Sequence, residues 1–251
     1  MGTDPKDAFN ALMAESRNTV IFTGAGISTE SGIPDFRSPG GVWTQNKPIP
    51  FQDFIMSKEA RLETWRRKFN VEKTMRDASP NVGHLAISQM VARGQVEKII
   101  TQNIDGLHQA SGVPESKIIE LHGNTTYARC LSCHLRHELD PIRAAFQRDE
   151  TLPVCETCGG IVKTATISFG QPMPEREMLE AQRDAISCDL FIAIGSSLVV
   201  FPAAALLPLA KENGAKLVIL NRERTDFDGL ADLTIHAEIG DFLSNLPTPT
   251  Y

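Results

Sequence analysis

The stretch Thr19-Val-Ile-Phe-Thr-Gly-Ala-Gly-Ile-Ser28 decides the fold, because a β-branched and aromatic run breaks directly into a glycine-rich turn. Gly24 and Gly26 have no Cβ, so they allow a tight turn and a close approach of a ligand to the backbone. A strand, a glycine-rich turn and the start of a helix form a phosphate cradle of unpaired N–H groups. The G-x-G-x-x-G spacing is incomplete, since Thr29 replaces the third glycine. On spacing alone, nucleotide binding competes with an ordinary glycine-rich turn.

Five further apolar runs follow the first one, at 96–101, 118–121, 190–194, 217–220 and 233–235. Most are continuous rather than alternating, which is typical of parallel strands covered on both faces. Helical patterns lie between several of them, at 82–92, 174–186 and 203–213. Alternating strands and helices predict an α/β fold, a Rossmann-like doubly wound parallel sheet.

Polar or glycine-rich residues follow five of the six predicted strands, at Gly24-Ala-Gly26, Gln102-Asn-Ile-Asp105, His122-Gly123, Gly195-Ser-Ser197 and Asn221-Arg-Glu223. In a doubly wound sheet the ligand crevice lies at the carboxyl ends of the strands. Five such ends would be a coincidence in a purely structural sheet. We therefore expect a binding site at this edge.

Each of these residues also has a structural interpretation. His122 ends an apolar strand and can take a proton near neutral pH, but a lone histidine is ordinarily a hydrogen-bonded core residue. Asn103 or Asp105 can cap a following helix, and so can Ser196 or Ser197. Capping and ligand contact are compatible. Three other histidines fall within or beside predicted elements and are interpreted as structural: His84, His108 and His236.

Four of the five cysteines form two C-x-x-C pairs separated by twenty-one residues: Cys130, Cys133, Cys155 and Cys158. This spacing is typical of zinc knuckles, which supply four thiolates in a tetrahedron and leave no open position for catalysis. The pattern predicts one structural zinc; four reduced thiols or a redox dithiol pair are the alternative. Cys188 has no partner in the sequence and is expected to pack as a small buried hydrophobe.

The bulk composition is that of a soluble globular protein, with 251 residues, 41% hydrophobic and 22% charged. The length suits one sizeable domain or one domain plus a small insertion. A net charge of −6 argues against direct nucleic-acid binding, and no apolar run is long enough for a membrane span. The polar N-terminus is unlike a secretory signal, so a cytoplasmic enzyme is expected.

In this order the motifs resemble the sirtuin family of NAD-dependent protein deacylases. They are Gly24-Ala-Gly-Ile-Ser-x-x-Ser-Gly-Ile-Pro-Asp-Phe-Arg37, Thr101-Gln-Asn-Ile-Asp105, His122-Gly123, both cysteine pairs, Phe169-Gly170, Gly195-Ser-Ser-Leu198 and Asn221. The resemblance covers nearly the whole chain and is of the bacterial type. It implies a Rossmann-like NAD-binding domain (1–37, 82–126 and 164–251), a cofactor loop and helical module (38–81) and a zinc-binding module (127–163).

The resemblance implies that acylated-lysine proteins or peptides are substrates and that NAD is consumed. The acyl oxygen would attack the nicotinamide ribose, nicotinamide would leave, and an alkylimidate would form. Products would be free lysine, nicotinamide and O-acyl-ADP-ribose. The alternatives are a protein mono-ADP-ribosyltransferase, which would use the same site, and a catalytically silent NAD-sensing module. The presence of His122, Asn103 and Asp105 argues against the silent module. A nicotinamide dehydrogenase is disfavoured by the incomplete glycine fingerprint.

The resemblance also implies residue roles. His122 would be the general base on the ribose hydroxyls, while Asn103 would position the nicotinamide ribose and Asp105 the carboxamide. The cofactor loop would be formed by Gly24, Ala25, Gly26, Ser28, Asp35, Phe36 and Arg37, with Phe36 shielding the reactive ribose. The rest of NAD would contact Gln102, Ile104, Gly195, Ser196, Ser197, Asn221, Arg222, Glu223 and Ile239. The substrate would contact Ile167, Ser168, Phe169 and Gly170.

This chain departs from the family pattern where acyl specificity is set. Ser168 replaces an aromatic residue that usually walls the acyl tunnel, which makes a roomier or more polar tunnel possible. The Tyr and Arg, three apart, that mark members acting on acidic acyl groups have no counterpart in Thr64-Trp-Arg-Arg-Lys-Phe69. We therefore predict removal of acetyl or longer neutral acyl groups over desuccinylation.

Overall fold

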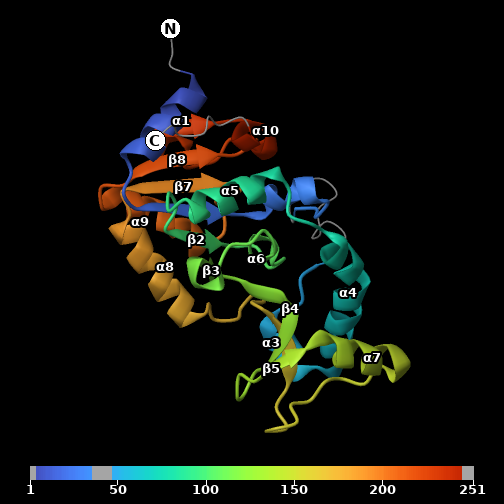
Figure 1. Cartoon of the computed structure of the whole chain (residues 1–251). Coiled ribbons are helices and arrows are strands. Elements are labelled where there is room, and N and C mark those ends of the chain that lie inside the picture. The colour runs from blue at the N-terminus through green and yellow to red at the C-terminus, as the bar shows by residue number, and fades with distance from the viewer. Residues whose placement is uncertain (1–3, 36–46, 245–251) are drawn as a thin grey trace.

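A six-stranded parallel sheet forms the centre of the computed structural model, which describes residues 4–35 and 47–244 (Figure 1). Its order is β3-β2-β1-β7-β8-β9, the doubly wound order, and every neighbouring pair is parallel. The strands are β1 (Thr19–Thr23), β2 (Lys98–Thr101), β3 (Ile118–Glu120), β7 (Leu190–Ile194), β8 (Lys216–Leu220) and β9 (Leu233–Ile235). The predicted fold class and the six predicted strands are confirmed.

Helices cover both faces of this sheet, which explains the continuous apolar runs. On one face Phe22 and Phe191 pack with α8 (Glu175–Ser187) and α9 (Leu206–Glu212). On the other face Ile21 packs with α1 (Pro5–Glu15), α5 (Val82–Ala92) and α10 (Ile239–Ser244). Because successive side chains of a strand alternate between faces, adjacent residues of β1 enter two different cores.

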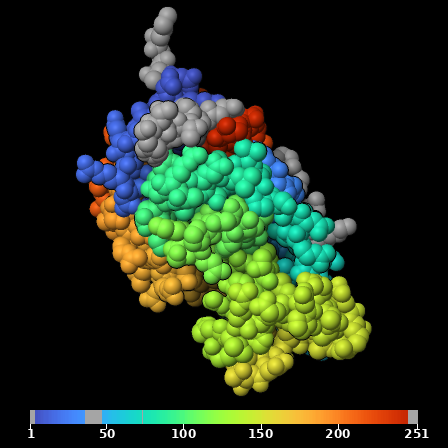
Figure 2. All heavy atoms as spheres, viewed as in Figure 1, coloured from blue at the N-terminus to red at the C-terminus, as the bar shows by residue number. Residues whose placement is uncertain are grey.

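A smaller antiparallel sheet, ordered β5-β4-β6, carries the cysteine pairs and projects from the main body (Figures 1 and 2). Its strands are β4 (Gly123–Cys130), β5 (Arg136–Glu138) and β6 (Val162–Thr166). Beside it lie the helices α3 (Phe51–Met56), α4 (Lys58–Asp77) and α7 (Leu139–Asp149). The helices α3 and α4 fall in the segment 38–81, which was expected to be helical, whereas α7 was not predicted.

A third apolar core joins α4 to this small sheet. Trp65 of α4 is 1% exposed and packs with residues of β4, α7 and β6, among them Phe146 and Val162. Phe69 stacks on Trp65, with ring centroids 5.4 Å apart. The helical insert and the cysteine-bearing sheet are therefore packed as one unit.

Short helical turns complete the described chain: η1 (Ala25–Ser31), α6 (Leu107–Ala110), η2 (Glu115–Lys117), η3 (Ala203–Ala205) and η4 (Asp228–Leu230). The helix predicted at 203–213 is η3 followed by α9. Within residues 4–35 and 47–244, no helix combines the length and the apolarity that crossing a bilayer requires.

Candidate active site

A cavity of about 780 Å³ lies at the carboxyl ends of β1, β2, β7 and β8. It is also walled by the segment after β6 and by residues that precede or belong to α3 and α4. The predicted crevice at this edge of the sheet is thus present. The predicted site residues that line it are Gly24, Ala25, Gly26, Asp35, Gln102, Asn103, Ile104, His122, Ile167, Ser168, Phe169, Gly170, Gly195, Ser196, Ser197, Asn221, Arg222, Glu223 and Ile239.

The loops after β1 and β7 touch through their backbones. The N–H of Gly26 donates to the carbonyl of Gly195 over 2.7 Å, and that of Gly24 to Ile194 over 3.0 Å. A Cβ on Gly24 or Gly26 would lie within 2.8 Å of Gly195 or Ser196 atoms. The sequence-based interpretation, in which these glycines leave N–H groups free for a ligand, is corrected here. The two loops can touch only because Gly24 and Gly26 have no side chain, and the N–H groups of both glycines are used in hydrogen bonds to the end of β7 and the loop after it.

The helix expected after the glycine turn is the 3-10 helix η1. Thr29 lines the cavity, and its hydroxyl donates to the carbonyl of Gly26 over 2.9 Å. The threonine at the position of the missing third glycine therefore stabilises the turn by a hydrogen bond within it.

Asn103 is fixed by two hydrogen bonds from its side-chain amide. Its Nδ2 donates to the carbonyl of Gly24 at 3.0 Å and to the hydroxyl of Ser28 at 3.2 Å. Ser28 in turn donates to Oδ2 of Asp105 over 2.7 Å, while Oδ1 of Asp105 accepts the N–H of Leu107. Ser28 and Asp105 do not belong to the cavity lining. In this structure Ser28 and Asp105 hold Asn103 through hydrogen bonds from the side away from the cavity. Asp105 bonds the first residue of α6, but the N-cap of this helix is Gly106, so the interpretation of Asp105 as the cap itself is wrong.

Gln102 connects the ends of β2 and β7. Its side-chain Nε2 donates to the hydroxyl oxygen of Ser196 over 2.9 Å, and the N–H of Leu198 donates to the same oxygen over 3.2 Å. Ser196 is thus both a turn-capping residue and a cavity residue. The next helical element, η3, begins only at Ala203, so the interpretation of Ser196 as a helix cap is wrong, and its contact with a ligand stays a prediction.

His122 has a defined tautomer. Its Nδ1 lies 2.9 Å from the carbonyl oxygen of Gln102, which can only accept, so Nδ1 carries the proton and Nε2 keeps a lone pair. Burial lowers the pKa of this imidazole, and the hydrogen bond to Gln102 offsets part of the effect. His122 is therefore a neutral base at pH 7 in the wall of the cavity.

The segment after β6 is held from both sides. The N–H of Ile167 donates to the carbonyl of His122 over 2.8 Å, and the N–H of Phe51 donates to the carbonyl of Phe169 over 2.9 Å. Ser168 accepts the N–H of Gln171 in a tight turn. This segment consequently connects His122, which follows β3, to the first residue of α3.

Arg67 reaches the cavity, together with Thr64 one helical turn before it. Neither residue was predicted at the site from the sequence. The tyrosine of the acidic-acyl pair is absent, as predicted, but an arginine is present, so that prediction is corrected in part. Arg67 is already engaged, because its Nε lies 2.6 Å from Glu63 and one terminal nitrogen donates to the carbonyl of Lys47.

Two residues of the predicted cofactor loop, Phe36 and Arg37, lie outside the described residues. Sequence reasoning missed a set of cavity residues from distant segments: Lys47, Pro48, Ile49, Phe54, Gln171, Met173, Val200, Phe201, Pro202, Ala237 and Glu238. Of these residues only Phe201 carries a signal of its own, because its exposed aromatic ring at the cavity is typical of a binding surface, and that exposure is visible only in the structure.

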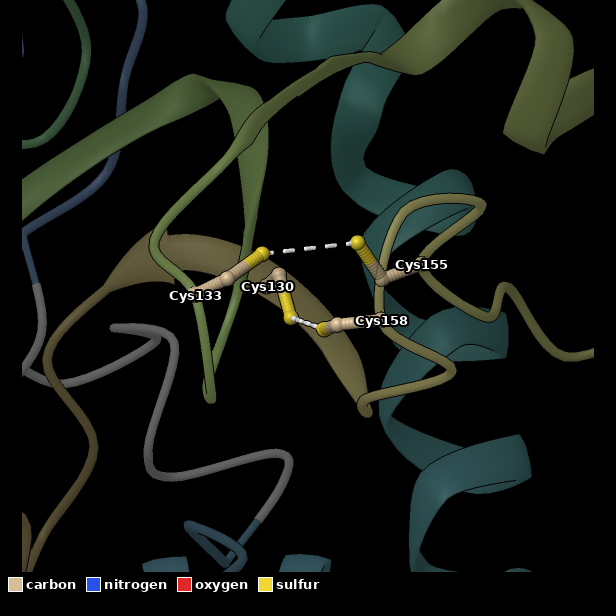
Figure 3. A group of neighbouring side chains, drawn as sticks. All are labelled: Cys130, Cys133, Cys155 and Cys158. Carbon is tan, nitrogen blue, oxygen red and sulfur yellow. Dashed lines mark hydrogen bonds between the residues drawn. The ribbon is translucent and has the colours of Figure 1, made fainter.

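The four paired cysteines come together at one end of the small sheet, where Cys130 ends β4 and the other three lie in the adjoining loops (Figure 3). Their sulfurs lie within 4.8 Å of one another, with 3.5 Å between Cys130 and Cys158 and 3.6 Å between Cys133 and Cys155. A tetrahedral zinc with bonds of about 2.3 Å requires sulfurs about 3.8 Å apart. The donor set fits one zinc, and Ser132 donates its N–H to the Cys130 sulfur over 3.4 Å.

Comparison with known proteins agrees with this geometry. A family model described as "Sir2 family" matches residues 24–202. Relatives named NAD-dependent protein deacetylase occur in Rhodopseudomonas palustris, at 57% identity, and Bradyrhizobium diazoefficiens, at 56%. They align over 92% of this chain and over 92% and 91% of their own lengths.

Solved structures show the same similarity in three dimensions. A Sir2 protein with p53 peptide and NAD⁺ has a TM-score of 0.85 at 36% identity, covering 95% of both chains. A Sir2 protein bound to acetylated peptide has a TM-score of 0.84 at 34% identity, covering 96% of both chains.

Proposed function

Because this chain belongs to the Sir2 family and is an NAD-dependent protein deacetylase, we propose that its cavity binds NAD with an acetylated lysine and that His122 is the general base. The observation that carries this proposal is the His122 ring, fixed in one tautomer at the wall of a cavity to which the loops at the carboxyl edge of the sheet all contribute. The relatives solved with acetylated peptide and with NAD⁺ support the same occupants.

The lining residues fit NAD by their chemistry. Asn103 and Gln102 carry amides, which donate and accept, as ribose hydroxyls and a carboxamide require. Ser196, Asn221 and Ile239 would hold the adenosine half, beside the ion pair of Arg222 and Glu238. When bound, NAD supplies the ADP-ribose that takes up the acyl group and releases nicotinamide.

His122 would remove a proton from a ribose hydroxyl through the lone pair on Nε2. The Gln102 carbonyl would keep the ring oriented and stabilise the imidazolium by accepting from Nδ1–H. Burial disfavours the charged ring, as the lowered pKa indicates, so the proton would be passed on after the step.

Backbone groups after β6 would receive the substrate. The N–H of Ile167 is used by His122, so the carbonyl of Ile167 is the group that would accept from the acyl-lysine amide. Arg67 is paired with Glu63, and an anionic acyl group would have to compete with that carboxylate. This supports acetyl or longer neutral acyl groups over succinyl, despite the presence of Arg67.

We retain the proposed division into a NAD-binding domain (1–37, 82–126 and 164–251), a helical module (38–81) and a zinc module (127–163). The common core around Trp65 suggests that the last two act together. Four thiols gathered as a metal-ligand set suit a reducing compartment, which supports a cytoplasmic location.

A panel of acetyl-, butyryl-, longer-acyl and succinyl-lysine peptides, assayed with and without NAD, tests the proposal. We expect NAD-dependent cleavage of the neutral acyl groups, with O-acyl-ADP-ribose as the product in mass spectrometry. Faster cleavage of the succinyl than of the acetyl peptide would overturn the proposed acyl preference. ADP-ribosylated protein in place of O-acyl-ADP-ribose would instead favour the mono-ADP-ribosyltransferase.

A further inference from the structure

Two buried histidines, His84 and His108, lie edge to face behind the active site and have no role in the proposed reaction. Their ring centroids are 5.2 Å apart, and the side chains are 0% and 2% exposed. Neither residue lines the cavity. One nitrogen on each ring is buried without a hydrogen-bond partner, Nε2 of His84 and Nδ1 of His108.

The hydrogen bonds at the opposite ends of the rings fix both tautomers. The N–H of Asn81 donates to Nδ1 of His84 over 3.4 Å, so the His84 proton resides on Nε2. Nε2 of His108 lies 2.9 Å from the hydroxyl oxygen of Thr23, whose proton is already donated to Thr101. Nε2 of His108 must therefore be the donor, and its Nδ1 keeps a lone pair.

The two unpartnered nitrogens are consequently complementary, a donor on His84 and an acceptor on His108. A buried polar group without a partner costs about 1–3 kcal/mol. The two ring nitrogens form no direct hydrogen bond in this structure, so the complementary donor and acceptor favour pairing through one buried water. Burial lowers the pKa of His84 to about 4 and that of His108 to about 3, and the carboxylate of Asp105 offsets only part of the effect on His84. Both rings are therefore neutral near pH 7.

Each end of this pair is bonded to a segment that carries the proposed NAD site. Asn81 donates from Nδ2 to the carbonyl of Ile27 at 2.7 Å and to the hydroxyl of Ser31 at 3.0 Å, so it holds η1. At the other end, the Thr101 hydroxyl oxygen accepts the N–H of Asn103 over 3.0 Å. The chain of contacts runs from the cofactor loop to the main chain of Asn103.

We propose that His84 and His108 form one neutral hydrogen-bonded relay, in which one buried water accepts from His84 Nε2–H and donates to His108 Nδ1, and that this relay positions Asn103 and η1 for NAD. The two histidines are positioning residues, because they reach the reacting groups only through Asn81, Thr23 and Thr101. The positioning role rests on the proposed placement of NAD, whereas the tautomers of the two rings do not.

Imidazole ¹⁵N NMR of the zinc-loaded full-length chain tests the relay directly. We expect His84 and His108 to be protonated at Nε2 and not to titrate between pH 5.5 and 8, whereas His122 is protonated at Nδ1. Assignments come from single substitutions. A proton on Nδ1 of either buried ring, or titration of either near pH 6.5, would overturn the relay even if the proposed function holds.

Steady-state kinetics test the positioning role. His108→Leu removes the donor to Thr23 and should raise the KM for NAD at least fivefold with little change in the KM for acetyl peptide. His108→Gln keeps an N–H near the Nε2 position and should restore most of the loss. Val91→Ala, another buried residue of α5, the helix of His84, is the matched control for a change in stability alone. An unchanged KM for NAD in His108→Leu, or an equal rise in Val91→Ala, would show that the pair is merely structural. If His108→Leu does not fold, the NMR tautomers decide.

Discussion

The N–H of Gly26 donates to the carbonyl oxygen of Gly195 across 2.7 Å, so two loops 169 positions apart form one continuous backbone surface. Gly195 has φ +64°, and a Cβ there would lie 2.4 Å from the nitrogen of Ile27. The floor of the cavity thus depends on the absence of side chains at this contact.

Gly195→Ala should separate the two loops. We expect NAD affinity to fall more than tenfold and the free energy of unfolding to fall by about 1–3 kcal/mol, because both the φ and the space are unsuitable for a Cβ. Titration calorimetry and urea unfolding measure the two effects. Gly229→Ala is the control, since a Cβ there meets no atom within 4 Å. Wild-type NAD affinity in Gly195→Ala would contradict the account.

His122→Ala should remove the proposed general base. We expect kcat for deacetylation to fall by a factor of about 10²–10⁴, while NAD binding changes little. Product formation followed by mass spectrometry and NAD binding by calorimetry provide the two readouts. Full NAD-dependent deacetylation by this variant would show that another group takes the proton.

The pH profile of kcat/KM should report the neutral His122. Because burial lowers the pKa of His122 below the ordinary value of about 6.5, the unprotonated base persists to lower pH than for an exposed histidine. We therefore expect the acid limb of the profile below pH 6.5. An acid limb above 6.5 would be incompatible with this assignment.

Removal of the zinc should destabilise the small sheet. Cys155→Ser should reduce bound zinc from one per chain toward zero and lower the melting temperature, because Cys155 is both a ligand candidate and part of the third core. Cys188→Ala is the matched control, since Cys188 is buried far from this group in sequence and packs against α8. Elemental analysis and thermal unfolding measure both variants. Stoichiometric zinc in Cys155→Ser would refute the assignment.

Stability should fall in mild acid because of the buried histidines. The pKa values of about 4 for His84 and 3 for His108 lie below the unfolded value of about 6.5, so the unfolded chain binds more protons below pH 6.5. Each should contribute up to about 1.4 kcal/mol per pH unit to the loss as pH falls from 6.5 toward 4. Urea unfolding at several pH values measures the slope, which should be shallower in His108→Gln. An equal slope in both proteins would mean that His108 titrates normally when folded.

The sequence predicted the sheet and much of the site because both depend on local patterns. Continuous apolar runs such as 190–194 identify buried parallel strands. The carboxyl ends of parallel strands lie on one edge of the sheet, whatever the conformation of the loops that follow them. His122 could be singled out because it ends such a run. Each C-x-x-C spacing brings its two sulfurs close enough to bind one metal, so the four metal ligands could be predicted.

The rest depended on contacts between distant segments. The glycines at 24 and 26 were attributed to ligand approach, but the space beside them is filled by Gly195 and Ser196, which no local pattern reveals. Arg67 lines the cavity because the fold brings α4 next to the strand ends, which are distant from it in sequence. The carboxylate of Asp105 is bonded to the distant Ser28, a contact that no local pattern reveals. Its expected contact with the NAD carboxamide stays a prediction.

Trp65 has neighbours in α4 that line the cavity, Thr64 and Arg67, while its own ring lies in the core that contains Cys130 and Cys155. One rigid helix is thereby shared between the acyl end of the active site and the metal-ligand set. If binding at one of these places favours a particular position of α4, the two equilibria are thermodynamically coupled, and the coupling is reciprocal. An acyl-lysine that binds more tightly to the zinc-loaded protein must tighten zinc binding by the same factor, so substrate would protect the enzyme from chelators.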